Sequence, residues 1–197
     1  MLSEKKENSL YVLGVYTSLF FGMVVAGKFT IPFWPVSFTL QTLYLGLMQI
    51  FAPKYARSVM FIWFGSGIIG APVFSAGGGW NYLAHGYGTG YIIGMMLSTL
   101  LLCTPVTRLW RLMPEDLRAM PSEATTHDTH TLSEIMPAKA SYLVNLAIIY
   151  GCGFVYLSAL NLPLRGYNYL IAEIVKLILF KGLYKLYVRY IESESHL

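Results

Sequence analysis

The chain has 197 residues, of which 55% are hydrophobic and 12% are charged, against roughly 25% charged residues in an ordinary soluble domain. Water does not solvate so much apolar surface, so the composition excludes a soluble globular domain and favours the membrane class, in line with a mean hydropathy of +0.53. The net charge of +4 comes without a dense Lys/Arg cluster, so nucleic acid is not expected as a partner.

Six apolar runs reach or approach the length of a membrane-spanning helix, which is about 20 residues because the hydrocarbon layer is about 30 Å thick. The second and third runs are short. The predicted spans are 10–27, 37–52, 57–71, 88–106, 140–161 and 167–188. The sequence therefore predicts an all-α fold, a six-transmembrane-helix bundle that forms a single integral membrane domain over residues 1–197.

The positive charges predict the orientation, because Lys and Arg gather on the cytoplasmic side of a membrane. A cytoplasmic N-terminus leaves only Lys28 and Arg165 outside. Six helices then return the C-terminus to the cytoplasm, in a multi-pass protein of the cytoplasmic (inner) cell membrane. The cytoplasmic side would hold Lys5, Lys6, Lys54, Arg57, Arg108, Arg111, Arg118, Lys139, Lys181, Lys185 and Arg189.

Small residues recur every four positions in the first span, at Gly14, Ser18, Gly22 and Ala26. This spacing lets another helix approach closely. Two interpretations stay open: packing within the bundle, or a docking face for a partner subunit. The run is near spanning length and ends without an A-x-A-like cleavage site, so it is predicted to be retained rather than removed as a signal peptide.

The first external connection, 28–36, contains Pro32 and Pro35, which prevent a helix. Phe33 and Trp34 place large rings at the membrane surface, as an interfacial anchor or as part of a lid. In the lid interpretation, Gln41 points its amide into the bundle, together with Thr39.

The second external connection, 72–87, is dense in glycine and interleaved with rings and polar groups at Trp80, Asn81, Tyr82, His85 and Tyr87. Flexible linkers rarely carry so many rings, so the pattern favours a structured binding loop. The GxxxxGK[ST] spacing of a phosphate-binding loop is missing.

The cytoplasmic loop, 107–139, is the one long polar stretch and separates four predicted spans from two. His127, Asp128 and His130 lie in it, but chance spacing in a solvated loop explains them better than metal ligation. No metal site and no cofactor are predicted.

The last span contains Glu173 and Lys176, which share a helix face at positions i and i+3. Ionisable side chains inside a membrane are costly and usually mark a site or a pathway. The alternative is a structural ion pair that holds the bundle together.

These segments resemble the BioY family, the biotin-binding S components of energy-coupling factor (ECF) transporters. The most specific parts are Pro35-Val-Ser-Phe-Thr-Leu-Gln-Thr42, Gly70-Ala-Pro-Val-Phe74 with the glycine-rich loop, Gly90-Tyr91 and the Glu173/Lys176 pair. The family pattern has Asp where this chain has Glu173, and Pro where it has Tyr87.

The resemblance implies high-affinity binding and uptake of biotin across the cytoplasmic membrane, as a transport subunit and not an enzyme. It implies a transmembrane coupling subunit and ATPase subunits as partners in the lipid bilayer, with Gly14, Ser18, Gly22 and Ala26 facing the coupling subunit. Whether the chain also forms a homo-oligomer stays open.

Biotin carries two ureido N–H donors, a C=O acceptor, an apolar ring and a carboxylate. Glu173 would accept the ureido N–H groups, and Lys176 would contact either the carboxylate or the ureido oxygen. The neutral polar partners and the ring-covering residues would be Gln41, Asn81, Trp80, Tyr82, Tyr87, Tyr91, Phe33 and Trp34.

Two other functions are weighed against this one. An S component for thiamin or riboflavin would leave Lys176 without a carboxylate to bind. An intramembrane enzyme would need a motif that is missing: Ser66 in Gly65-Ser-Gly67 has the wrong spacing for a serine nucleophile, and HExxH is missing too.

Overall fold

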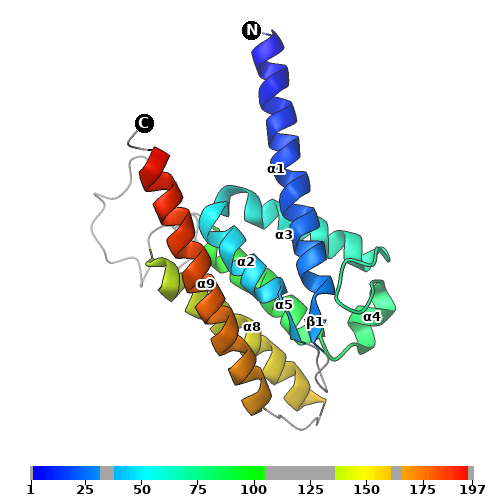
Figure 1. Ribbon diagram of the computed structural model, residues 1–197. Helices are drawn as coiled ribbons and strands as arrows, with labels where there is room; N and C mark the ends of the chain where they lie inside the picture. Colours follow the sequence, from blue (N-terminus) through cyan, green and yellow to red (C-terminus); the bar gives the residue numbers. More distant parts are fainter. Residues whose placement is uncertain (1, 32–37, 105–135, 161–165, 195–197) are drawn as a thin grey trace, which may run out of the picture.

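The computed structural model describes residues 2–31, 38–104, 136–160 and 166–194. In this part of the chain the fold is helical apart from one pair of two-residue strands, which confirms the predicted helical class (Figure 1). The elements are α1 (Leu2–Lys28), β1 (Thr30–Ile31), β2 (Phe38–Thr39), α2 (Gln41–Phe51), α3 (Pro53–Ile68), α4 (Trp80–His85), α5 (Thr89–Leu102), α8 (Ala138–Ala159) and α9 (Gly166–Glu194).

Each of the six predicted spans overlaps one helix, but the bounds and lengths differ from the expectation. Within the described residues, two segments are long and apolar enough to cross a membrane by length and composition, Leu10–Lys28 and Ala138–Ala159. Helix α2 has 11 residues and is therefore only about 16 Å long. It starts late because Phe38 and Thr39 pair with Ile31 and Thr30 in the antiparallel strands instead of joining the helix.

The glycine-rich connection is a folded segment, held to the end of α3 by backbone hydrogen bonds. Gly79 donates its N–H to the carbonyl of Gly67 at 2.6 Å, and Phe74 and Gly77 form a bridge. Gly77 and Gly79 have φ values of 143° and 100°, which residues with a side chain rarely adopt. The short helix α4 follows, and Lys28 at the end of α1 donates to the carbonyl of Phe74 at 2.8 Å.

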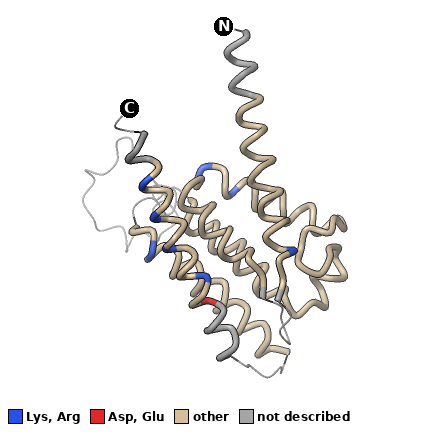
Figure 2. Tube along the Cα trace, viewed as in Figure 1, with Lys and Arg blue, Asp and Glu red and all other residues tan. Residues whose placement is uncertain are grey.

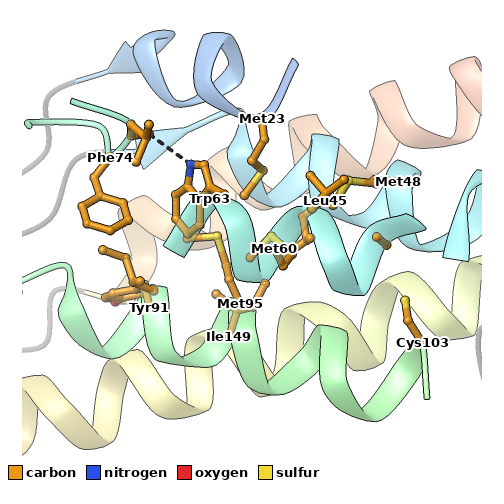
Figure 3. Packing of buried hydrophobic residues seen from close by; sticks show 14 of the residues in the cluster. Met23, Leu45, Met48, Met60, Trp63, Phe74, Tyr91, Met95, Cys103 and Ile149 are labelled. Carbon is orange, nitrogen blue, oxygen red and sulfur yellow. Dashed lines mark hydrogen bonds between the residues drawn. The ribbon is translucent and has the colours of Figure 1, made fainter. Parts of the chain in front are cut away.

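Trp63 of α3 is at the centre of the apolar core, and its indole N–H donates to the carbonyl of Val73 at 3.2 Å (Figure 3). The ring of Phe74 meets that of Trp63 edge to face, with centroids 4.9 Å apart. Phe74 fits there because Gly67 has no Cβ, which would overlap its ring. The core therefore fixes the start of the glycine-rich connection against α3.

Helices α5 and α8 pack closely at glycines. A Cβ on Gly94 would lie 2.7 Å from the Cα of Ile149, and one on Gly90 would lie 2.9 Å from the carbonyl oxygen of Cys152. The Tyr91 ring lies in turn over Gly153. This small-residue packing brings the two backbones together, as is common between helices in membranes.

Most of the described basic residues lie toward one end of the bundle, where the α2–α3 turn and the C-terminal half of α9 are found (Figures 1 and 2). We call this the basic end. Its exposed cations are Lys54, Lys139, Lys181, Lys185 and Arg189.

Candidate functional site

A charged pair lies inside the bundle on α9. The ammonium of Lys176 is 2.6 Å from Oε1 of Glu173, and the two side chains are 1% and 12% exposed. The spacing of three residues on one helix brings the two groups together, as the sequence predicted. Along the described part of α9 the neighbouring side chains Ile174, Val175 and Ile178 point outward and are exposed. The two charges therefore face the bundle and not its surface.

Side chains from two other helices form hydrogen bonds with this pair. The ammonium of Lys176 donates to the hydroxyl of Thr42 in the first turn of α2. The hydroxyl of Tyr150, on α8, donates to the same carboxylate oxygen of Glu173 that Lys176 contacts. The site is thus the junction of α2, α8 and α9, and we call it the three-helix junction.

Several buried polar atoms near this junction have no hydrogen-bond partner among the described residues. They include Oε2 of Glu173, the hydroxyl of Tyr142 and both side-chain amide atoms of Asn145. Buried polar groups are nearly always paired in folded proteins, because an unpaired group loses its bonds to water without replacement. The junction therefore holds donors and acceptors that a polar ligand could satisfy.

Aromatic rings flank the charged pair. Tyr142 stacks on Phe180 of α9 with centroids 4.3 Å apart, and Tyr91 of α5 meets Tyr150 edge to face at 5.5 Å. Phe154 lies beyond, with its centroid 6.0 Å from that of Tyr150. An acid–base pair with free polar atoms and aromatic neighbours is suited to a small ligand that has both a polar ring system and apolar surface.

The structure places the sequence-predicted site residues in three different settings. Glu173, Lys176 and Tyr91 come together at the junction through Tyr150. Gln41 is buried, but its amide donates to the carbonyl of Met23 at 3.4 Å and lies against Gly27, so it serves the α1–α2 contact.

The remaining predicted residues lie on or beside α4, or outside the described residues. Trp80 is 70% exposed and Tyr87 45% exposed. Asn81 is also exposed, while Tyr82 stacks on Phe74 with centroids 5.6 Å apart. Phe33 and Trp34 lie outside the described residues, as do His127, Asp128 and His130 of the predicted loop 107–139. The end of that loop was predicted too late, because α8 begins at Ala138.

The small-residue stripe of α1 divides into two halves. Gly22 and Ala26 pack inside the chain, and a Cβ on Gly22 would overlap the ring of Tyr44. Gly14 and Ser18 are exposed, and a Cβ on Gly14 would meet no atom within 4 Å. The packing interpretation therefore holds for the second half, and the first half is free to contact something else.

The sequence reasoning missed Thr42, Tyr142, Asn145 and Tyr150 as site residues. Asn145 offered a usable signal, because it is an amide between Val144 and Leu146 in an apolar run, where polar groups usually have a function. The two tyrosines gave no such signal, since tyrosine is also common at membrane surfaces.

One comparison with known proteins identifies a family, and another identifies a shared fold. The model of the BioY family matches residues 5–192. Among solved structures, the chain is similar to the S-component for biotin from an ECF-type ABC transporter, determined by crystallography at 2.1 Å. The TM-score is 0.58 at 18% sequence identity, over 91% of this chain and 93% of that chain, which shows a shared fold. No curated protein matches the chain.

Proposed function

The chain belongs to the BioY family, and from that premise we propose that it binds biotin and serves as the substrate-binding subunit of an ECF-type uptake transporter. The observation that carries the proposal is the buried Glu173–Lys176 pair, met by Thr42 and Tyr150 from two other helices. A solved structure that shares the fold is that of an S-component for biotin. This is a binding and transport role and not an enzymatic one.

The chemistry of the junction is complementary to that of biotin. Oε2 of Glu173 has no partner among the described residues and can accept a ureido N–H. Lys176 can donate to an oxygen of the ligand while its contact with Glu173 balances its charge. The rings of Tyr91, Tyr150 and Tyr142 offer apolar area to the fused ring system.

The proposed arrangement in the membrane has six spans with both termini in the cytoplasm, in a single domain of the inner membrane. The basic end supports it, since its cations would face the cytoplasm. Glu173 precedes Lys176 on α9, whose later turns carry Lys181, Lys185 and Arg189. The carboxylate of Glu173 would therefore lie nearer the outside than the ammonium of Lys176. The ligand would enter from the side of the glycine-rich connection.

The proposed partners are a transmembrane coupling subunit and the ATPase subunits of an ECF module. The N-terminal half of α1 extends beyond the rest of the bundle (Figure 1). Its apolar side chains Leu10, Tyr11 and Leu13 are 62%, 70% and 62% exposed, and Gly14 and Ser18 leave room for a neighbouring helix. This half of α1 is our candidate surface for the coupling subunit.

Binding assays on the purified full-length chain test the substrate. Isothermal titration calorimetry in detergent should show one-to-one binding of biotin and no heat with thiamin or riboflavin. Native mass spectrometry should find biotin carried through purification. Binding of thiamin or riboflavin in preference to biotin would overturn the substrate assignment.

Uptake assays test the transport role separately. Cells that express the chain together with an ECF coupling module should accumulate labelled biotin, and the same cells with an ATPase subunit inactivated should not. Binding without any module-dependent uptake would contradict the role as a transport subunit.

A further inference from the structure

Asn145 of α8 is a buried amide that the charged pair does not use. Its side chain is 0% exposed, and neither its nitrogen nor its oxygen has a hydrogen-bond partner among the described residues. Its neighbours Val144 and Leu146 in the chain are apolar. A side chain of this kind loses its hydration without compensation unless something at the site bonds to it.

The packing of the helices places Asn145 beside the charged pair. Tyr150 of α8 contacts Glu173, and Tyr142 stacks on Phe180, so α8 and α9 run antiparallel with Asn145 between those two contacts. On α2, Thr42 holds Lys176, and Gly46, one turn later, lies against the ring of Tyr142.

A Cβ on that same Gly46 would lie 3.6 Å from the amide nitrogen of Asn145. Asn145 therefore lies about one turn nearer the basic end than the Thr42–Lys176 contact. Together with the hydroxyl of Tyr142, it forms the inner wall of the three-helix junction.

The chemistry of an amide narrows what Asn145 can recognise. It offers a donor and an acceptor side by side, which matches a ligand edge that has N–H next to C=O. A cyclic urea presents that edge, whereas a carboxylate presents two acceptors and would leave the amide oxygen unpaired. The hydroxyl of Tyr142, whose ring is fixed on Phe180, is a second donor for the same carbonyl.

We propose that Asn145 is a specificity residue that pairs with the N–H/C=O edge of the ureido ring, with Tyr142 beside it. The ring system then lies at the inner end of the junction and the carboxylate of the ligand points toward the glycine-rich connection. This inference rests on the proposed function, since it assumes that biotin is the ligand.

Edited ligands test the pairing on the full-length chain. 2-Thiobiotin replaces the ureido C=O by C=S, a weaker acceptor, and biotin methyl ester removes the charge of the carboxylate. The variant is Asn145→Leu. The matched control is Gln49→Leu, because Gln49 is also a buried amide with an unpaired oxygen but bonds to Ser98 and Thr99 of α5.

In calorimetry, Asn145→Leu should lower biotin affinity by about 10- to 100-fold, the usual effect of losing one or two buried hydrogen bonds. The ratio of the affinity for biotin to that for 2-thiobiotin should fall toward one. The ratio of the affinity for biotin to that for its methyl ester should stay as in the unmodified chain. Gln49→Leu should leave both ratios unchanged.

Each other outcome overturns the inference. An equal loss for all three ligands would mean that Asn145 supports only the fold. A change in the methyl ester ratio would put the carboxylate, and not the urea, at Asn145. If Asn145→Leu does not fold, Asn145→Thr takes its place, because a threonine hydroxyl can bond to its own helix. The ratio of the affinity for biotin to that for 2-thiobiotin should fall in this variant too. Failure of the unmodified chain to bind biotin would instead refute the proposed function.

Discussion

Helix α8 takes part in two buried interfaces that differ in chemistry. Toward α5 it contributes Ile149 and Gly153, which meet glycines and a tyrosine ring at close range. Toward α2 and α9 it contributes Tyr150, which bonds to Glu173, and Tyr142 and Asn145, which lie against Gly46. Both interfaces are shielded from solvent, but among the described residues only the second combines charges with unpaired polar atoms.

The difference teaches which interface holds the bundle together and which has a binding role. Close backbone packing stabilises a membrane protein, because helices in lipid gain little from burying more apolar surface. Unpaired buried polar atoms do the opposite and lower stability. We therefore expect changes at the α5–α8 interface to affect folding first, and changes at the three-helix junction to affect ligand binding first.

The largest effect is expected from breaking the charged pair. Lys176→Met and Glu173→Leu should each lower biotin affinity by more than about 100-fold, since each removes a polar contact and leaves a buried charge unpaired. Calorimetry measures the affinity, and the thermal unfolding midpoint in detergent reports whether the bundle is intact.

The double variant Glu173→Leu/Lys176→Met separates a binding site from a structural ion pair. Replacing both charges removes the unpaired ion, so the unfolding midpoint should recover relative to either single variant. Biotin affinity should stay as low as in the single variants. Recovery of binding in the double variant would show that the pair only holds the helices together.

The next largest effect is on folding, from Gly94→Ala at the α5–α8 interface. The new Cβ would lie 2.7 Å from the Cα of Ile149, and such overpacking destabilises by about 1–3 kcal/mol. The unfolding midpoint should fall, while the protein that stays folded binds biotin normally. Gly151→Ala on α8 is the control, because its Cβ meets no atom within 4 Å. An equal fall in both variants would contradict close packing at Gly94.

A smaller effect on binding is expected from Thr42→Val, which keeps the shape of the side chain and removes the hydroxyl that accepts from Lys176. Loss of one such bond to a charged group is worth about 1.5–3 kcal/mol, so biotin affinity should fall roughly 10- to 150-fold. Thr99→Val on α5 is the control, since Thr99 is equally buried but bonds to Gln49 and Met95. It should leave affinity unchanged.

The smallest effect is expected where the glycine-rich connection joins α5. The hydroxyl of Thr89 donates to the carbonyls of Leu83 and Gly86 at 2.7 and 2.8 Å. Thr89→Val should therefore speed hydrogen exchange over 79–88 by about fivefold, equivalent to about 1 kcal/mol of local stability. Thr17→Val removes a hydrogen bond to the carbonyl of Leu13 in α1 and should leave hydrogen exchange over 79–88 unchanged. Unchanged exchange in Thr89→Val would mean that these bonds do not hold the connection.

Sequence reasoning predicted the helical class and the charged pair because both depend on local patterns. Charges in an apolar run are visible in the sequence, and the i, i+3 spacing decides that they meet. Which side chain meets them from another helix depends on rotation about that helix. Gln41 and Thr42 are neighbours, and the start of α2 after strand β2 turns Thr42 toward Lys176 and Gln41 toward Met23.

The same limit explains the tyrosines and α4. Tyr150 and Tyr142 are site residues only because α8 packs antiparallel to α9. The spacing of residues within α8 does not predict this tertiary contact. The sequence predicted that the rings of Trp80 and Tyr87 would cover the ligand. In the structure Trp80 is largely exposed and Tyr87 about half exposed, while Tyr82 between them in the sequence stacks on Phe74.

The pairing of Glu173 with Lys176 within one turn of α9 also bears on the electrical behaviour of the molecule. A membrane voltage does about 2.3 kcal/mol of work per elementary charge for each 100 mV crossed. Opposite charges that move together cancel this work, so a displacement of the pair along the field costs no net electrical work. The buried pair therefore contributes nothing to any voltage sensitivity of import, whereas a single charge at the same depth would.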